Sequence, residues 1–148
     1  GEADVVVFGL GRYGNRLANA LTQQGIRVVG VDFDPEVVRI QQLAGMDVRF
    51  GDGEAPDFVE SLPLADVPWI VSTLPDYPSN LALLHALDLH RYGGHIALVA
   101  RDDDDGKRFQ AFARVEILYP FNQAADFAAL DLAARIASAE LTHNKDRA

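Results

Sequence analysis

Short runs of consecutive apolar residues alternate along this chain with longer segments in which apolar residues recur every three or four positions. The short runs are rich in β-branched residues, and most are apolar throughout, as strands are when helices cover both faces of a parallel sheet. They predict six strands, at residues 4–8, 27–31, 47–50, 69–73, 95–100 and 115–119. The alternation predicts an α/β fold with a Rossmann-like, doubly wound, parallel six-stranded sheet.

The predicted helices between these strands are bounded by N-cap residues, prolines and glycines. The expected boundaries are Gly25 after the first helix, Asp34-Pro35 and Gly45 around the second, residues 57–62 for a short third, Pro78 and Gly93-Gly94 around the fourth, and the acidic run 102–105 before the fifth. Asn122 can cap a long last helix that runs to about residue 142. We therefore expect residues 1–148 to form one domain, in which residues 119–142 are a dimerisation helix region.

The first predicted strand ends in a GxGxxG motif that also opens the first predicted helix. The motif consists of Gly9, Leu10, Gly11, Arg12, Tyr13 and Gly14. In this strand–turn–helix context it is typical of dinucleotide binding. Gly9 permits the tight turn, Gly11 lets the backbone approach a pyrophosphate without an intervening Cβ, and Gly14 lets the helix pack closely on its strand. The amide groups at the helix N-terminus would then bind the phosphates.

Asp32 follows the second predicted strand, where dinucleotide-binding proteins place an acidic residue. Its carboxylate can accept hydrogen bonds from both hydroxyls of an adenosine ribose and would repel a 2′-phosphate, so NAD and NADH are favoured and NADP is disfavoured. Two nearby residues have two interpretations each. Asp34 either caps the second helix, which Pro35 favours, or assists Asp32 at the ribose. Arg12 either reaches a phosphate or a partner subunit, or it is a solvated loop arginine.

The composition narrows the classes of function. The net charge of −9 argues against nucleic acid and anionic membrane surfaces as partners, because both need clustered Lys and Arg. The chain has no cysteine, which excludes disulfides and thiolate metal sites, and no apolar stretch approaches the roughly 18 residues of a membrane span. The histidines and the run 102–105 lack metal-ligand spacing, and no P-loop, nucleophile elbow or Tyr-x-x-x-Lys pair occurs. We therefore predict no metal site and no catalytic residue.

Several segments together resemble one family of nucleotide-binding domains. They are GLGRYGNRLANALTQQGIRVVGVDFDPEVV, then Gly51-Asp52, STLPDYPSN, Arg101 and an alanine-rich last helix. In this order they resemble the RCK or TrkA-N domain, which lies on the cytoplasmic side of potassium channels, Trk/Ktr uptake systems and Kef-type cation/proton antiporters. The resemblance implies a cytoplasmic regulatory domain, not an enzyme, that controls a transmembrane transporter or channel. It implies NAD, NADH or AMP as the ligand, with ADP and ATP as further candidates.

The resemblance also extends the predicted nucleotide site beyond the glycine motif. Gly51 and Asp52 would contact the adenine, and the loop after the fourth strand would lie over the ribose and diphosphate. The full predicted site comprises Gly9, Leu10, Gly11, Arg12, Tyr13, Gly14, Asp32, Phe33, Asp34, Gly51, Asp52, Gly53, Ser72, Thr73, Leu74, Asp76 and Arg101. Two departures from the family pattern, Gly53-Glu54 and the prolines at 75 and 78, leave the choice of nucleotide open.

The last predicted helix carries apolar residues on two faces. One stripe consists of Phe127, Leu130, Ala134, Ala137 and Leu141, and the other of Ala125, Ala128, Leu132, Ile136 and Ala139. A helix on a monomer needs one apolar face, so the second face predicts a homodimer, which the resemblance also favours. The alternative is that these alanines reflect helix propensity alone. Two other functions stay open: the cofactor-binding half of an NAD-dependent oxidoreductase, and a free-standing redox-sensing subunit of a transporter.

Overall fold

The computed structural model describes residues 2–112 and 114–147. The chain divides into two compact units, Gly1–Leu118 and Tyr119–Ala148. We call the first the sheet unit and the second the helix unit, and we describe each by itself. The expectation of a single domain stays a prediction.

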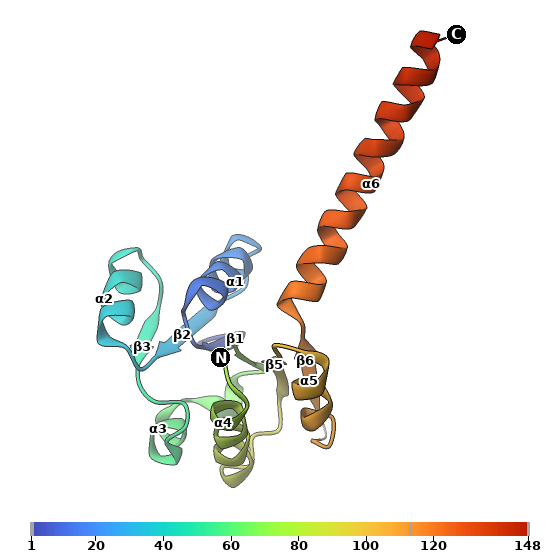
Figure 1. Ribbon diagram of the computed structural model, residues 1–148. Helices are drawn as coiled ribbons and strands as arrows, with labels where there is room; N and C mark the ends of the chain where they lie inside the picture. Colours follow the sequence, from blue (N-terminus) through green and yellow to red (C-terminus); the bar gives the residue numbers. More distant parts are fainter. Residues whose placement is uncertain (1, 113, 148) are drawn as a thin grey trace. The chain divides into compact units, whose positions relative to one another are not determined.

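The sheet unit is built on six parallel strands (Figure 1). They are β1 (Val5–Phe8), β2 (Val28–Asp32), β3 (Val48–Phe50), β4 (Trp69–Ser72), β5 (His95–Val99) and β6 (Val115–Leu118). Their order in the sheet is β3-β2-β1-β4-β5-β6, which confirms the doubly wound prediction. The strand order reverses between β1 and β4, and open α/β sheets bind ligands in the crevice beyond the carboxyl ends of the strands at such a point.

Helices cover both faces of this sheet (Figure 1). They are α1 (Arg12–Gln23), α2 (Pro35–Leu43), α3 (Pro56–Ser61), the short 3₁₀ helix η1 (Leu64–Asp66), α4 (Tyr77–Leu89) and α5 (Asp103–Phe109). Val5 and Val7 of β1 pack in the core with residues of α1 and α2, whereas Val6 and Phe8 pack in the core with residues of α3, α4 and α5. Because alternate residues point to opposite covered faces, the strand is apolar throughout.

An ion pair fixes the register of β1 against β2 just before both strands begin. The Arg27 amide donates to Asp4 Oδ2 at 2.8 Å, and Arg27 Nη2 lies 2.8 Å from Asp4 Oδ1. The hydrogen bonds from Arg27 lower the pKa of the Asp4 carboxyl to about 2. Both residues were expected within the strands. Instead, they lie just before the two strands, at the edge of the sheet opposite the carboxyl ends of the strands.

The end of α4 and the start of α5 differ from the expected boundaries. α4 ends at Leu89, not at Gly93-Gly94, and the residue with left-handed backbone after it is Arg91, with φ 57°. Its amide donates to the Asp88 carbonyl, so an arginine takes the place usually held by glycine. α5 begins inside the acidic run, because Asp102 itself is the N-cap.

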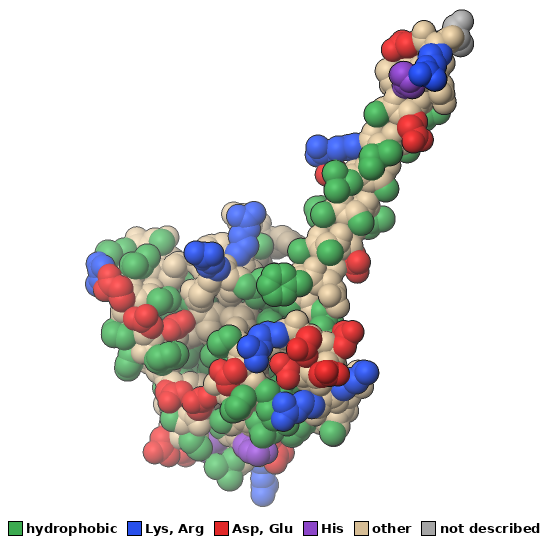
Figure 2. Space-filling view, in the orientation of Figure 1, with side chains coloured by type: hydrophobic (Ala, Val, Ile, Leu, Met, Phe, Trp, Pro, Cys, Tyr) green, Lys and Arg blue, Asp and Glu red, His purple; other side chains and the backbone are tan. Residues whose placement is uncertain are grey.

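The helix unit consists of α6 (Pro120–Arg147), a helix of 28 residues. It begins before Asn122, which therefore lies within the first turn and is not the N-cap, and it continues past residue 142. It has no buried residue, and Figure 2 shows hydrophobic side chains along much of its visible length. No helix within 2–112 and 114–147 is both long and apolar enough to cross a membrane.

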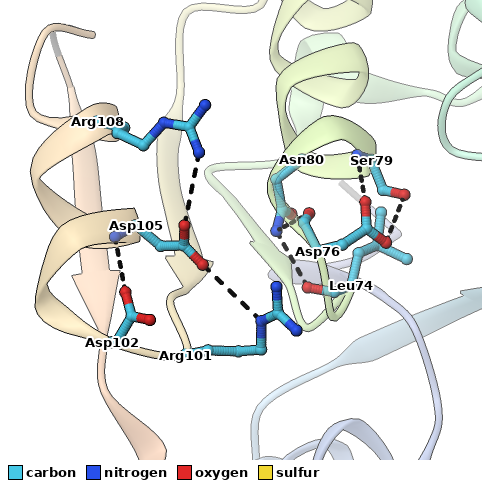
Figure 3. A network of polar contacts seen from close by, with 8 residues as sticks. All are labelled: Leu74, Asp76, Ser79, Asn80, Arg101, Asp102, Asp105 and Arg108. Atoms are coloured by element: carbon cyan, nitrogen blue, oxygen red, sulfur yellow. Dashed lines mark hydrogen bonds and ion pairs between the residues drawn. The ribbon is translucent and has the colours of Figure 1, made fainter.

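Two polar side chains are buried among the described residues, and they bond to each other. The Ser72 hydroxyl, at the end of β4, donates to the Asn80 side-chain oxygen in α4. The Asn80 amide nitrogen donates to the carbonyls of Leu74 at 3.0 Å and Asp76 at 3.2 Å. One buried side-chain amide therefore binds two carbonyls of the loop between β4 and α4 (Figure 3).

Replacing Asn80 with alanine should lower the free energy of unfolding by about 2–4 kcal/mol, because the buried Ser72 hydroxyl and the Leu74 carbonyl lose the Asn80 side chain as a partner. The Asp76 carbonyl keeps its bond from the backbone amide of residue 80. Urea denaturation followed by circular dichroism measures the loss. Ser79→Ala is the matched control: its half-buried hydroxyl donates to Asp76 at 2.9 Å, and its removal should cost less than about 1 kcal/mol. Equal losses in the two variants would contradict the role given to Asn80.

Candidate functional site

A cavity of about 560 Å³ opens at the carboxyl ends of the strands, beside the point where the strand order reverses. It is lined by the glycine turn after β1, the end of β2, the loop after β3 and the loop after β4. The lining residues are Phe8, Gly9, Gly11, Arg12, Tyr13, Gly14, Val31, Asp32, Phe33, Gly51, Asp52, Gly53, Glu54, Thr73, Leu74, Pro75, Asp76 and Ser79. Segments far apart in the sequence thus meet at the place where the topology predicts a ligand site.

The structure accounts for glycine in a different way at each of the three positions of the motif. Gly9 has φ +90°, which side chains rarely tolerate. A Cβ on Gly14 would lie 1.9 Å from the Gly9 carbonyl oxygen, so this glycine allows α1 to pack against the turn. Gly11 has φ −66°, and a Cβ there would meet no other protein atom within 4 Å. Neither backbone nor packing therefore requires glycine at position 11, and the space left open there faces the cavity.

The N-terminus of α1 lacks the side-chain cap that α2, α4 and α5 have, and α3, which follows Ala55, lacks one too. Asp34 Oδ1 accepts from the Glu36 amide at 2.9 Å in α2, Asp76 Oδ1 from the Ser79 amide at 2.8 Å in α4, and Asp102 Oδ1 from the Asp105 amide at 2.9 Å in α5. α1 follows Gly11, which supplies no side-chain cap, and has no acidic residue in its first turn. Its first amides therefore need acceptors from outside the helix, and they carry the positive end of the helix dipole.

The Asp32 carboxylate is an anchor of the glycine turn. Its Oδ2 accepts from the Leu10 amide at 2.8 Å, and its Oδ1 accepts from the Asp34 amide at 2.9 Å. Each carboxylate oxygen keeps a further lone pair, so the same group can still accept hydrogen bonds from a ligand in the cavity. The sequence indicated only the ligand role, because the hydrogen bond to Leu10 crosses 22 positions.

The loop after β3 is shaped by two aromatic rings. A Cβ on Gly51 would lie 2.1 Å from the Phe58 ring, and one on Gly53 would lie 2.7 Å from the Phe8 ring. Asp52 Oδ1 accepts from the Glu54 amide at 2.9 Å, which closes the turn between the two carboxylates. The glycines here are explained by packing, and the loop brings Asp52 and Glu54 to the cavity lining.

The loop after β4 is bonded to the glycine turn. The Thr73 hydroxyl donates to the Gly9 carbonyl at 2.6 Å, and the Thr73 amide donates to the Phe8 carbonyl at 2.8 Å. Asp76 ends the loop as the N-cap of α4 and accepts from both the amide and the hydroxyl of Ser79 (Figure 3). The glycine turn and the loop after β4 are therefore joined directly by hydrogen bonds.

The cavity lining brings together thirteen of the seventeen predicted residues, and four lie elsewhere. Leu10 is buried in the core, and Ser72 is buried against Asn80. Asp34 caps α2, so the capping interpretation is confirmed. Arg101 has a mostly exposed side chain whose Nε lies 3.8 Å from Asp105 Oδ2.

Arg101 belongs to a chain of contacts along α5. Asp105 also lies 3.7 Å from Arg108 Nη1 (Figure 3). The Arg108 guanidinium stacks 3.6 Å above the centre of the Tyr77 ring at the start of α4. The acidic run 102–105 was expected to favour a helix N-terminus. One of its members, Asp105, also forms ion pairs with two arginines. A nucleotide contact by Arg101 stays a prediction.

Five lining residues were not among the predicted ones: Phe8, Val31, Glu54, Pro75 and Ser79. Phe8 and Val31 are strand residues with almost no exposed surface. An apolar strand carries no sequence signal that tells which of its residues will line a cavity. Glu54 and Ser79 are polar residues within three positions of predicted ones, which is the signal that could have found them. Partial burial also raises the pKa of the Tyr13 phenol.

Comparison with known proteins agrees with this geometry. The sequence model of the TrkA-N domain matches residues 5–120. KefC of Cronobacter sakazakii (strain ATCC BAA-894), a glutathione-regulated potassium-efflux system protein, is 30% identical over 100 residues, which are 68% of this chain. They are only 16% of KefC, so the chain spans a small part of that protein's length.

Solved structures share the fold. The NAD(P)-binding domain of an exopolyphosphatase-related protein from Archaeoglobus fulgidus has a TM-score of 0.77 and 23% identity, and the match covers 90% of this chain and 98% of that one. The Kef CTD of Shewanella denitrificans in its AMP-bound form has a TM-score of 0.70 and 19% identity, over 88% of this chain and 79% of that one. With the family model matching most of its length, the chain belongs to the TrkA-N domain family.

Proposed function

We propose that this chain is a regulatory nucleotide-binding domain on the cytoplasmic side of a membrane, and that it controls a potassium or cation transporter or channel. The observation that carries the proposal is the α1 N-terminus: it has no side-chain cap, it lies at a cavity of about 560 Å³, and its N-cap Gly11 leaves open space there. A nucleotide phosphate would supply the acceptors that the first amides of α1 need. The likeness to KefC supports a membrane transporter as the partner.

The proposed ligand is NAD, NADH or AMP, with ADP and ATP as further candidates. A relative of this fold binds AMP, and another is named as an NAD(P)-binding domain, which supports an adenine nucleotide. Asp32 lies at the glycine turn, 2.8 Å from the Leu10 amide, where its carboxylate would accept hydrogen bonds from ribose hydroxyls. A 2′-phosphate placed there would meet a negative charge, so NADP is disfavoured.

Regulation would follow from the contacts that join the cavity walls. Thr73 bonds the β4 loop to the glycine turn, and Asn80 bonds the same loop to α4. A nucleotide that binds between these walls would favour one arrangement of them over another. It can regulate a transporter only to the extent that its affinity differs between the two arrangements.

We also propose that α6 pairs with the α6 of a second copy to form a homodimer. The helix has no buried residue, and its exposed large apolar side chains are Phe121, Phe127, Leu130, Leu132, Ile136 and Leu141. An isolated helix gains little stability without an apolar partner surface, and a second copy offers a matching one.

A binding role explains the cavity better than catalysis does. Its described lining residues include no histidine, lysine or cysteine, which are the side chains that most often transfer protons or attack substrates at neutral pH. The carboxylates Asp32, Asp52 and Asp76 each accept a hydrogen bond from a backbone amide. The match to the TrkA-N domain and the likeness to KefC support the regulatory domain over the cofactor half of an oxidoreductase.

Substitutions at two glycines of the motif should distinguish an effect on ligand binding from an effect on folding. Gly11→Ala should weaken AMP and NAD binding at least about ten-fold, because its Cβ would occupy space in the cavity, while the free energy of unfolding changes by no more than about 1 kcal/mol. Gly14→Ala should instead destabilise the fold by several kcal/mol, through the 1.9 Å clash with Gly9. Titration calorimetry and urea denaturation of both variants measure this. Unchanged affinity in Gly11→Ala would remove the main support for the site.

The proposed role of Asp32 predicts a preference between dinucleotides. NADP should bind at least about ten-fold more weakly than NAD, because its 2′-phosphate would be repelled by the carboxylate. Calorimetry with both ligands measures the preference. Asp32→Ala should weaken NAD binding and reduce the preference, and a denaturation curve must accompany it because the variant also loses the hydrogen bond from Leu10. Equal binding of NAD and NADP by the parent would refute this role.

The proposed dimer can be broken on one face of α6. Ile136→Glu places a charge among the exposed apolar side chains and should convert the dimer to a monomer, as measured by light scattering at micromolar concentration. Ser138→Glu is the matched control, since Ser138 lies at helical spacing from Asp131 and Arg135, which form an ion pair on the polar face of the helix. That variant should stay dimeric. If Ile136→Glu keeps the parent's mass, α6 does not form the interface.

A further inference from the structure

Among the described residues that line the cavity, negatively charged side chains outnumber positively charged ones. Four carboxylates line it: Asp32, Asp52, Glu54 and Asp76. Arg12 is the one cationic side chain among the described lining residues. Sites for triphosphates normally add a lysine, several arginines or a metal ion to the amides of a helix N-terminus. This cavity has the amides and a single guanidinium.

Two of the carboxylates lie close to the phosphate-binding end of the cavity. Asp32 accepts from the Leu10 amide within the glycine turn, and Asp76 ends the loop that Thr73 bonds to Gly9. Their hydrogen-bond partners on the protein side are backbone amides and the Ser79 hydroxyl, which carry no net charge. Asp76 lies at the N-terminus of α4, whose dipole offsets part of its charge, and no full positive charge is bonded to either carboxylate in these contacts.

Two arginines at α5, Arg101 and Arg108, lie against Asp105 and do not line the cavity. No group of three or more acidic, histidine or cysteine side chains within 2–112 and 114–147 is arranged to hold a metal ion. Among the described lining residues, a polyphosphate would therefore meet Arg12 as the one cation, together with the dipole of α1, which is equivalent to about half a positive charge.

We propose that the cavity selects nucleotides by charge: it accepts ligands of low net negative charge, AMP and NAD, and discriminates against ADP and more strongly against ATP. This inference rests on the proposed nucleotide site. One phosphate group can use the α1 amides and Arg12, whereas each additional phosphate adds roughly one negative charge without a new cationic partner. Repulsion by four carboxylates then grows with every phosphate, because these charges lie within a Debye length of the site.

Calorimetric titration of the whole chain with AMP, ADP, ATP and NAD, in buffer containing EDTA, tests the proposal. We expect ATP to bind at least about ten-fold more weakly than AMP, with ADP between them and NAD comparable to AMP. Raising the salt concentration should reduce the ratio of AMP to ATP affinity, because salt screens repulsion. A site dominated by cations would show the opposite sign.

A pair of matched variants locates the effect. Glu54→Gln removes one lining carboxylate and should raise ATP affinity by about two- to five-fold while changing AMP affinity much less. Glu60→Gln removes an exposed carboxylate of α3 that does not line the cavity, and should leave the AMP to ATP ratio unchanged.

The outcomes separate this inference from the proposed function. ATP binding as tight as AMP binding, or a ratio that widens with salt, overturns charge selection while nucleotide binding stands. Failure of all four nucleotides to bind overturns both. An equal effect of Glu54→Gln and Glu60→Gln shows that the net charge of the whole chain, and not the cavity lining, causes any discrimination.

Discussion

The site depends on one tight packing contact, the approach of α1 to the turn that precedes it. Gly14 lies so close to the Gly9 carbonyl that a Cβ would sit 1.9 Å from the oxygen, and this closeness lets the helix begin directly at the carboxyl edge of the sheet. The same arrangement places Gly11 at the N-cap, where no side chain can satisfy the first amides. A packing requirement within the protein therefore creates a group of donors that only an external acceptor can satisfy.

The acidic residue opposite this turn serves the fold and the site together. Asp32 bonds the Leu10 amide across the turn and the Asp34 amide at the start of α2, so it joins β2 and the glycine loop through the protein's own hydrogen bonds. A ligand that uses its remaining lone pairs meets a carboxylate that is already oriented, which lowers the entropic cost of binding. Thr73 and Asn80 extend the same rigidity to the opposite wall.

The elements of the sheet unit could be predicted from the sequence because local signals and burial agree there. Continuous apolar runs identified the strands to within about a residue at most ends, and Asp34-Pro35 marked the start of α2 correctly. Long-range contacts could not be predicted in this way. The bond from Thr73 to Gly9 crosses 64 positions. Arg91 takes a left-handed conformation with no local signal in its side chain, and Arg101 faces Asp105 because the acidic run turned into a helix at Asp102.

The helix unit shows the limit of pattern analysis most clearly. The sequence indicated two apolar stripes, and a stripe predicts burial, yet no residue of α6 is buried within this chain. The helix has 28 residues and large apolar side chains exposed along it, and tertiary packing of an apolar face is the usual main source of helix stability. The proposed second copy of α6 would supply a partner surface for those side chains. Nucleotide binding in the proposed site would alter that pairing only if the two are coupled in free energy.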